Sequence, residues 1–198
     1  VVQAPNAGTN GSVTVCSDAT PVNLFAQLGG TPASGGTWTR PNGTAHSGTY
    51  LPGTEVGGTY TYTVQGTAPC ANASSTVQVT RVIAPNAGNN GSITVCSTNS
   101  SFALLGILGG TPSGSGTWRD PANGAFSGTF VPGTSTPGVY AYVVTGTAPC
   151  VNDTGFVTVS VSIAPNAGAN GASTICSSDA PFPLFPLLGG TPTAGGSW

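Results

Sequence analysis

The five residues Ala-Pro-Asn-Ala-Gly occur three times in this chain, beginning at positions 4, 84 and 164, so the interval is 80 residues in both cases. Other landmarks keep the same step without insertion or deletion: Cys16, Cys96 and Cys176; Trp38, Trp118 and Trp198; Cys70 and Cys150. A long fixed period is typical of an array of like units. We therefore divide the chain into repeat 1 (1–83), repeat 2 (84–163) and the first half of repeat 3 (164–198). We expect it to be a segment of a longer processed polypeptide.

Each repeat consists of short β-branched or aromatic runs separated by Gly- and Pro-rich turns. The clearest run is 59–64, where Tyr60, Tyr62 and Val64 alternate with threonines, as in a half-buried strand. Similar reasoning predicts strands at 12–16, 37–39, 48–53 and 76–80. The run 22–28 places Leu24 and Leu28 four residues apart, which fits one helical turn or one strand face, and we favour a strand.

No stretch has the length and periodicity of an amphipathic helix. Roughly seven short strands per repeat, with turns every 8–12 residues, predict an all-β fold of tandem immunoglobulin-like or PKD-like antiparallel β-sandwiches with an 80-residue period. We expect the core of each sandwich to contain the recurring aromatics Trp38, Trp118, Tyr60 and Tyr140.

Several runs together resemble the tandem PKD-like and immunoglobulin-like repeats of large secreted surface proteins of Bacteroidetes-type bacteria. These runs are Val13–Cys16, Leu28–Pro32, Gly36–Trp38, Gly58–Val64 and Pro69–Cys70. The resemblance covers the chain repeat by repeat. It implies a secreted, cell-surface protein of the adhesin or gliding-motility-associated type, and a stalk, adhesin or fibre. It supplies no catalytic residue to carry over.

The cysteines are typical of an oxidising, extracellular compartment, because each complete repeat has two at fixed places with no histidine partner for a zinc site. We predict the disulfides Cys16–Cys70 and Cys96–Cys150, with the partner of Cys176 outside the segment. Each bond would close a loop of about 54 residues, which corresponds to roughly 4 kcal/mol in the chain-entropy description. Pairing between repeats, such as Cys70–Cys96 with Cys150–Cys176, remains open.

Charged residues make up only 4% of the chain and the net charge is −2, so there is no basic patch for nucleic acid. No apolar run reaches the length of a membrane helix, and we expect no membrane insertion in this segment. A chain with so few charges needs another source of solubility, and covalently attached sugar could supply it. Asn-x-Ser/Thr sequons, which we interpret as possible glycosylation sites, occur at Asn10, Asn42, Asn72, Asn90, Asn99 and Asn152.

Candidate catalytic and metal-binding residues do not recur with the period. His46 corresponds to Phe126, Asp18 to Thr98 and Ser178, and Glu55 to Ser135. A site that matters in every unit should be present in every unit. We therefore expect no catalytic site, no metal site and no cofactor, and we place His46 in an exposed or half-buried loop.

Three functions remain in competition. The first is an extracellular structural protein that forms a surface stalk or self-assembles into a fibre, with copies of itself or adjacent repeats as partners. The second is an adhesin that binds glycans or other cells through its loops, with 39–48 and 119–128 as the most variable candidates. The third is a spacer region of a secreted hydrolase.

Overall fold

The computed structural model describes all residues from Val1 to Trp198 and contains no α-helix. Repeat 1 contributes seven strands and repeat 2 another seven, and 3₁₀ turns occur in all three copies. None of these turns has the length and apolarity to cross a bilayer. In repeat 1 the elements are β1 (Gly11–Cys16), β2 (Val22–Asn23), η1 (Phe25–Gln27), β3 (Thr37–Thr39), β4 (Ala45–His46), β5 (Thr49–Tyr50), β6 (Gly58–Val64) and β7 (Ala73–Val82).

Repeat 2 reproduces this order almost residue for residue at the 80-residue interval. Its elements are β8 (Gly91–Cys96), β9 (Phe102–Ala103), η2 (Leu104–Ile107), β10 (Thr117–Arg119), β11 (Ala125–Phe126), β12 (Thr129–Phe130), β13 (Gly138–Val144) and β14 (Asp153–Ser162). In the third copy only the turn η3 (Phe185–Leu187) is regular.

Each complete repeat forms one large and one small sheet. The large sheet has the order β1-β7-β6-β3-β4 in repeat 1 and β11-β10-β13-β14-β8 in repeat 2. The small sheets are the pairs β2–β5 and β12–β9. The two layers enclose a core of leucine, tyrosine and valine side chains in each repeat. The expected sandwich is present, with one departure: β1 pairs with β7, and β8 with β14, in parallel.

The alternation in β6 and β13 places two tyrosines of each strand in the core, and Trp38, Trp118, Tyr60 and Tyr140 are buried as expected. Trp38 lies against Tyr62 with ring centroids 5.0 Å apart. The Tyr62 hydroxyl donates to the Ala33 carbonyl at 2.7 Å and accepts from the Gly36 N–H at 2.8 Å. A buried tyrosine needs such partners for its polar end, and these bonds attach the 33–36 loop to the sheet.

The prediction of one strand over 22–28 was wrong beyond its first residues. The strand β2 ends at Asn23, whose side-chain oxygen accepts the Phe25 N–H at 2.9 Å and starts the turn η1. Both Leu24 and Leu28 are buried, at the two ends of this turn. The spacing of four therefore reflects one tight helical turn that directs two leucines into the core. The short strand β4, within the stretch expected to be a loop, was also missed.

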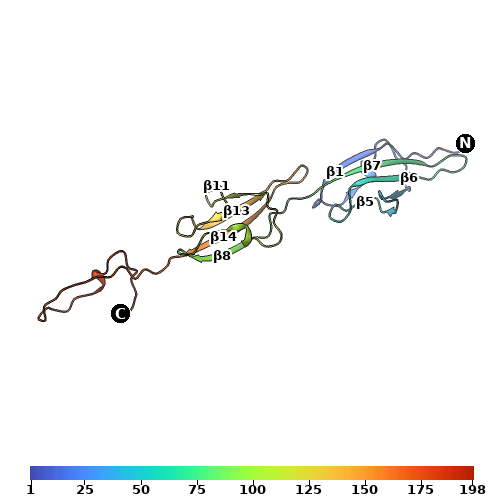
Figure 1. Ribbon diagram of the computed structural model, residues 1–198. Coiled ribbons are helices and arrows are strands. Elements are labelled where there is room, and N and C mark those ends of the chain that lie inside the picture. The colour runs from blue at the N-terminus through green and yellow to red at the C-terminus, as the bar shows by residue number, and fades with distance from the viewer.

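The units lie end to end, with the N terminus and the third copy at opposite ends of an elongated chain (Figure 1). A single connector joins β7 to β8. The third copy retains the entry turn of the repeat, because Ala169 bridges Gly189 as Thr9 bridges Gly29. Residues 171–176, which correspond to β1 and β8, form no strand.

Candidate functional site at the junction between repeats

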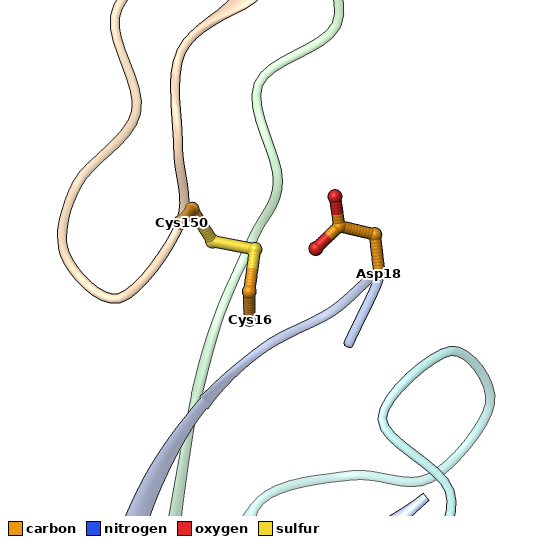
Figure 2. Close-up of side chains that lie close together, drawn as sticks. All are labelled: Cys16, Asp18 and Cys150. Carbon is orange, nitrogen blue, oxygen red and sulfur yellow. A yellow bond between two sulfur atoms is a disulfide. The ribbon is translucent and has the colours of Figure 1, made fainter. Parts of the chain in front are cut away.

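A disulfide joins Cys16 of repeat 1 to Cys150 of repeat 2, with Cα atoms 5.0 Å apart (Figure 2). The predicted bonds Cys16–Cys70 and Cys96–Cys150 were therefore wrong. The alternative set, Cys70–Cys96 with Cys150–Cys176, is not formed either, since Cys70, Cys96 and Cys176 are free. The bond spans 134 positions of the sequence and links two consecutive units.

The parallel pairing of β1 with β7 explains why a bond within one repeat does not form. Cys16 is in register with Val82, at the carboxyl end of β7, whereas Cys70 lies in the loop that precedes the amino end of β7 at Ala73. Nine steps of about 3.3 Å along a strand separate these ends by roughly 30 Å. Disulfides require Cα atoms within about 7 Å of each other, so Cys16 and Cys70 cannot meet in one folded unit.

The same geometry brings Cys16 close to the next repeat. The Ser17 N–H donates to the Val82 carbonyl at 2.8 Å, and the Ser17 hydroxyl accepts the Ala84 N–H at 2.9 Å. The end of β1 is thus attached to the connector that leaves repeat 1. Cys150 approaches that connector from the other side, because its sulfur lies 3.6 Å from the Val82 carbonyl oxygen. The end of β1, the connector that follows β7 and the loop that carries Cys150 are far apart in the sequence and meet at this joint.

Asp18 is the third member of this cluster, and its carboxylate and the two sulfurs lie within 4.8 Å of one another (Figure 2). Metal binding by cysteine requires the thiolate, and both sulfurs here are used in a covalent bond. The cluster then offers a single carboxylate. Its counterparts Thr98 and Ser178 carry no charge. The arrangement is that of a crosslinked joint.

A second polar cluster belongs to repeat 1 alone. Glu55 accepts from the Arg40 guanidinium at 2.9 Å and from the Leu51 N–H at 2.8 Å, and His46 Nε2 lies 3.2 Å from it. Burial favours the neutral acid, but these donors hold the pKa of Glu55 below its usual value. The expected loop position of His46 was wrong, because His46 lies in β4 with its side chain 1% exposed.

The sequon asparagines occupy exposed positions, and the side-chain oxygens of the recurring pairs take part in the fold. Asn10 and Asn90 accept the N–H of Thr76 and Phe156, both at 2.9 Å. Asn72 and Asn152 cap the Gly66 and Gly146 N–H groups in the same manner. All six residues are exposed, namely Asn10, Asn42, Asn72, Asn90, Asn99 and Asn152.

No protein-family model and no curated protein sequence matches this chain. Among solved structures it is similar to hemolin, an insect immune protein whose domain arrangement has implications for homophilic adhesion. The TM-score is 0.52 at 16% identity, over 81% of this chain and 47% of hemolin. It also matches the I-band fragment I67–I69 of titin, with a TM-score of 0.47 at 15% identity, over 78% of this chain and 64% of the fragment.

The chain thus spans about half the length of hemolin. At this level of identity the likeness shows the fold alone. Together with the two-layer architecture of both complete repeats, it confirms the prediction of tandem immunoglobulin-like β-sandwiches.

Proposed function

We propose that this chain is a load-bearing section of an extracellular stalk or fibre, built from immunoglobulin-like units in tandem, and that it acts structurally, without catalysis. The observation that carries the proposal is the disulfide between Cys16 and Cys150, because it crosslinks one unit to the next across their connector. A bond inside a unit would stabilise that unit alone. A bond between units also limits how far they separate or bend.

The position of the bond suits a chain under tension. A pulling force that enters through residues 1–16 passes across the disulfide to Cys150 and bypasses the residues between them. The bond spans 134 positions. At about 3.5 Å per extended residue, the segment it protects corresponds to roughly 470 Å of chain that cannot be pulled out while the disulfide is intact.

Composition and the disulfide support an extracellular array. Disulfides persist in oxidising compartments outside the cytoplasm. With three arginines and no lysine, the chain also offers few cleavage positions to trypsin-like proteases. The exposed sequon asparagines could carry sugars that keep a weakly charged surface hydrated. The resemblance to repeats of secreted bacterial surface proteins supports the same assignment.

Self-association is part of this proposal. The apolar side chains of the third copy lie exposed where those of repeat 2 are buried. Trp198 is 80% exposed and Trp118 8%. A surface of that kind can be covered by added strands. In repeats 1 and 2 this surface is covered by the second half of the same unit, so the partners that we propose for it are copies of the repeat, whether they belong to the same polypeptide or to another.

Force spectroscopy of the chain pulled from its two ends tests the load-bearing role. We expect the oxidised chain to extend by little more than its flanking residues and the third copy, and to gain roughly 470 Å after reduction. The double variant Cys16→Ser with Cys150→Ser should give the long extension without reduction. The single variant Cys70→Ser is the control and should behave as the unmodified chain. Equal extensions before and after reduction would contradict the proposal.

Negative-stain electron microscopy of source-derived material tests the assembly. Uniform filaments with an axial repeat of one or two unit lengths support a fibre, and separate strings of beads rooted in an envelope support a stalk. Compact particles with neither form would contradict both.

A further inference from the structure

The free cysteines Cys70 and Cys96 occupy the same positions in the repeat as the two ends of the observed disulfide. Cys70 corresponds to Cys150, and Cys96 corresponds to Cys16, at the 80-residue interval. The observed bond therefore joins the first cysteine of one repeat to the second cysteine of the next. Whether the rule extends to the free thiols depends on whether each has the surroundings of its bonded counterpart.

Cys96 has the surroundings of Cys16. The Ser97 N–H donates to the Ser162 carbonyl at 2.9 Å, as Ser17 does to Val82 at 2.8 Å. The Ser97 hydroxyl accepts the Ala164 N–H at 3.0 Å, as Ser17 does from Ala84 at 2.9 Å. The end of β8 is thus attached to the connector leaving repeat 2 in the manner of β1.

Cys70 has the surroundings of Cys150. Its N–H donates to the Thr67 carbonyl at 2.9 Å, and the Cys150 N–H donates to Thr147 at the same distance. Its sulfur lies 3.8 Å from the Val2 carbonyl oxygen, whereas that of Cys150 lies 3.6 Å from Val82. Val2 and Val82 are equivalent positions of the two connectors, so Cys70 lies beside the connector that enters repeat 1.

The connector that follows repeat 2 also repeats the local structure of the connector that follows repeat 1. In the third copy the Gly168 N–H donates to the Asn166 side-chain oxygen at 2.9 Å, as Gly88 does to Asn86. The bridge between Ala169 and Gly189 repeats the one between Asn89 and Gly109. The connector beside Cys96 therefore has the same local structure as the connector that lies beside the Cys16–Cys150 disulfide.

We propose that the inter-unit disulfide is one step of a continuous ladder. Cys96 bonds to the thiol in the Thr-Ala-Pro-Cys loop of the unit that follows repeat 2, and Cys70 bonds to the thiol that ends the first strand of the unit that precedes repeat 1. In each step two thiols lose two protons and two electrons to an external disulfide oxidant, as in thiol–disulfide exchange, and one sulfur–sulfur bond forms.

Hydrogen bonding prepares the half-buried Cys96 thiol for this reaction. The Thr98 hydroxyl, 3.2 Å from the Cys96 sulfur, lowers the pKa of that thiol, with a further contribution from the Thr98 backbone. The Ser178 hydroxyl has the same effect on the pKa of Cys176. A lower pKa increases the thiolate fraction, which is the attacking form.

The ladder determines which residues carry load along the array. The disulfide proposed at Cys70 and the disulfide proposed at Cys96 are connected by a short covalent path. This path runs from Cys70 through β7, the connector and β8 to Cys96. All other residues of the unit lie off this path. Consecutive bonds overlap in sequence, so two such paths run side by side. Tension is carried by disulfides and by strands that lie parallel to the long axis of the molecule (Figure 1).

Disulfide mapping of source-derived material tests this inference, which rests on the proposed array. The protein is alkylated before and after reduction and digested without reductant, and crosslinked peptides are identified by mass spectrometry. We expect Cys70 and Cys96 to be labelled only after reduction. Cys96 should be linked to a Thr-Ala-Pro-Cys peptide. The Cys16–Cys150 peptide in the same digest is the internal control.

The sequence of the partner peptide identifies its source. A Cys96 peptide linked to the Cys70 peptide of this chain comes from two copies joined head to tail, because Cys70 lies at the entrance of repeat 1 and Cys96 at the exit of repeat 2. A partner with a different sequence around Thr-Ala-Pro-Cys comes from a further repeat of the same polypeptide. Both results support the ladder. Free thiols at Cys70 and Cys96, capping by a small thiol, or a Cys16–Cys70 peptide would overturn it. Filaments in which Cys96 is a free thiol would support the proposed function and contradict only the disulfide ladder.

Discussion

Residues 91–96 and 171–176 have closely related sequences and different structures. The first, Gly-Ser-Ile-Thr-Val-Cys, is the strand β8, and the second, Gly-Ala-Ser-Thr-Ile-Cys, forms no strand. The difference lies in what each can pair with. β8 is in parallel register with β14 along its whole length, whereas the third copy has no strand of that kind beside it. Strand propensity alone does not decide the state of this segment.

Side-chain burial also differs between repeat 2 and the third copy. Leu104 is fully buried in repeat 2, and its equivalent Leu184 is 51% exposed. The turn η3 and the bridge at Ala169 persist in the third copy, because their hydrogen bonds lie within residues 164–198. Local turns therefore form from local sequence, and strands and core need the second half of the unit.

The largest expected effect comes from completing the third copy. Residues 39–83 continue the repeat in phase after Trp198, and we expect a chain extended by them to form a strand at 171–176. Amide hydrogen exchange there should slow by a factor of about 1,000 or more, because core strands open with nearly the full free energy of unfolding. Hydrogen exchange followed by mass spectrometry measures this, with 91–96 as the reference. Unchanged fast exchange in the extended chain would contradict our explanation.

The next effect is on stability. Leu104→Ala should lower the free energy of unfolding of repeat 2 by about 2–5 kcal/mol, because it removes a fully buried side chain from a packed core. Leu184→Ala is the matched control and should change stability by less than about 0.5 kcal/mol. Urea titration of both variants measures the difference. Equal losses would show that the third copy is packed as repeat 2 is.

A smaller effect is expected at the asparagine that precedes the first strand of each repeat. Asn90→Ala removes the acceptor of the Phe156 N–H at the start of the β8–β14 pairing and should cost about 1 kcal/mol. Asn170→Ala changes the equivalent residue, which has no strand beside it, and should leave stability unchanged. Thermal unfolding followed by circular dichroism compares the two. A loss for Asn170→Ala would place an unrecognised partner at that position.

The smallest expected effect is a difference between the two complete repeats in how their stability depends on pH. The folded-state pKa of Glu55 is lowered, so its carboxylate stabilises repeat 1 above the unfolded value of about 4.3. This contribution is lost as the pH falls through the folded-state pKa. Repeat 2 has Ser135 at the equivalent position and should lack this contribution. Urea titrations at pH 7 and pH 3 should show the pH effect in the native chain and a reduced one in Glu55→Gln.

Prediction from sequence succeeded where side chains act on near neighbours. The alternation of Tyr60 and Tyr62 predicted β6 and the burial of its aromatics, and the period predicted a second unit like the first. It failed at 22–28, because leucines four residues apart fit two conformations, and only packing against the sheet favours the turn. It failed for His46 because the residues that it contacts, Glu55 and Tyr60, are not its near neighbours in the sequence.

The sequence by itself determined the period, the all-β composition and the residues available to the core, since these depend on spacing and side-chain chemistry. Only the tertiary structure decided the disulfide. Cysteines at 16, 70, 96 and 150 allow several pairings, and the spacing favoured bonds within each repeat, which do not form. The parallel pairing of β1 with β7 then puts Cys16 and Cys70 at opposite ends of one unit and brings Cys16 to Cys150 of the next. Which thiols meet is a matter of distance in the folded array, and spacing along the sequence does not specify it.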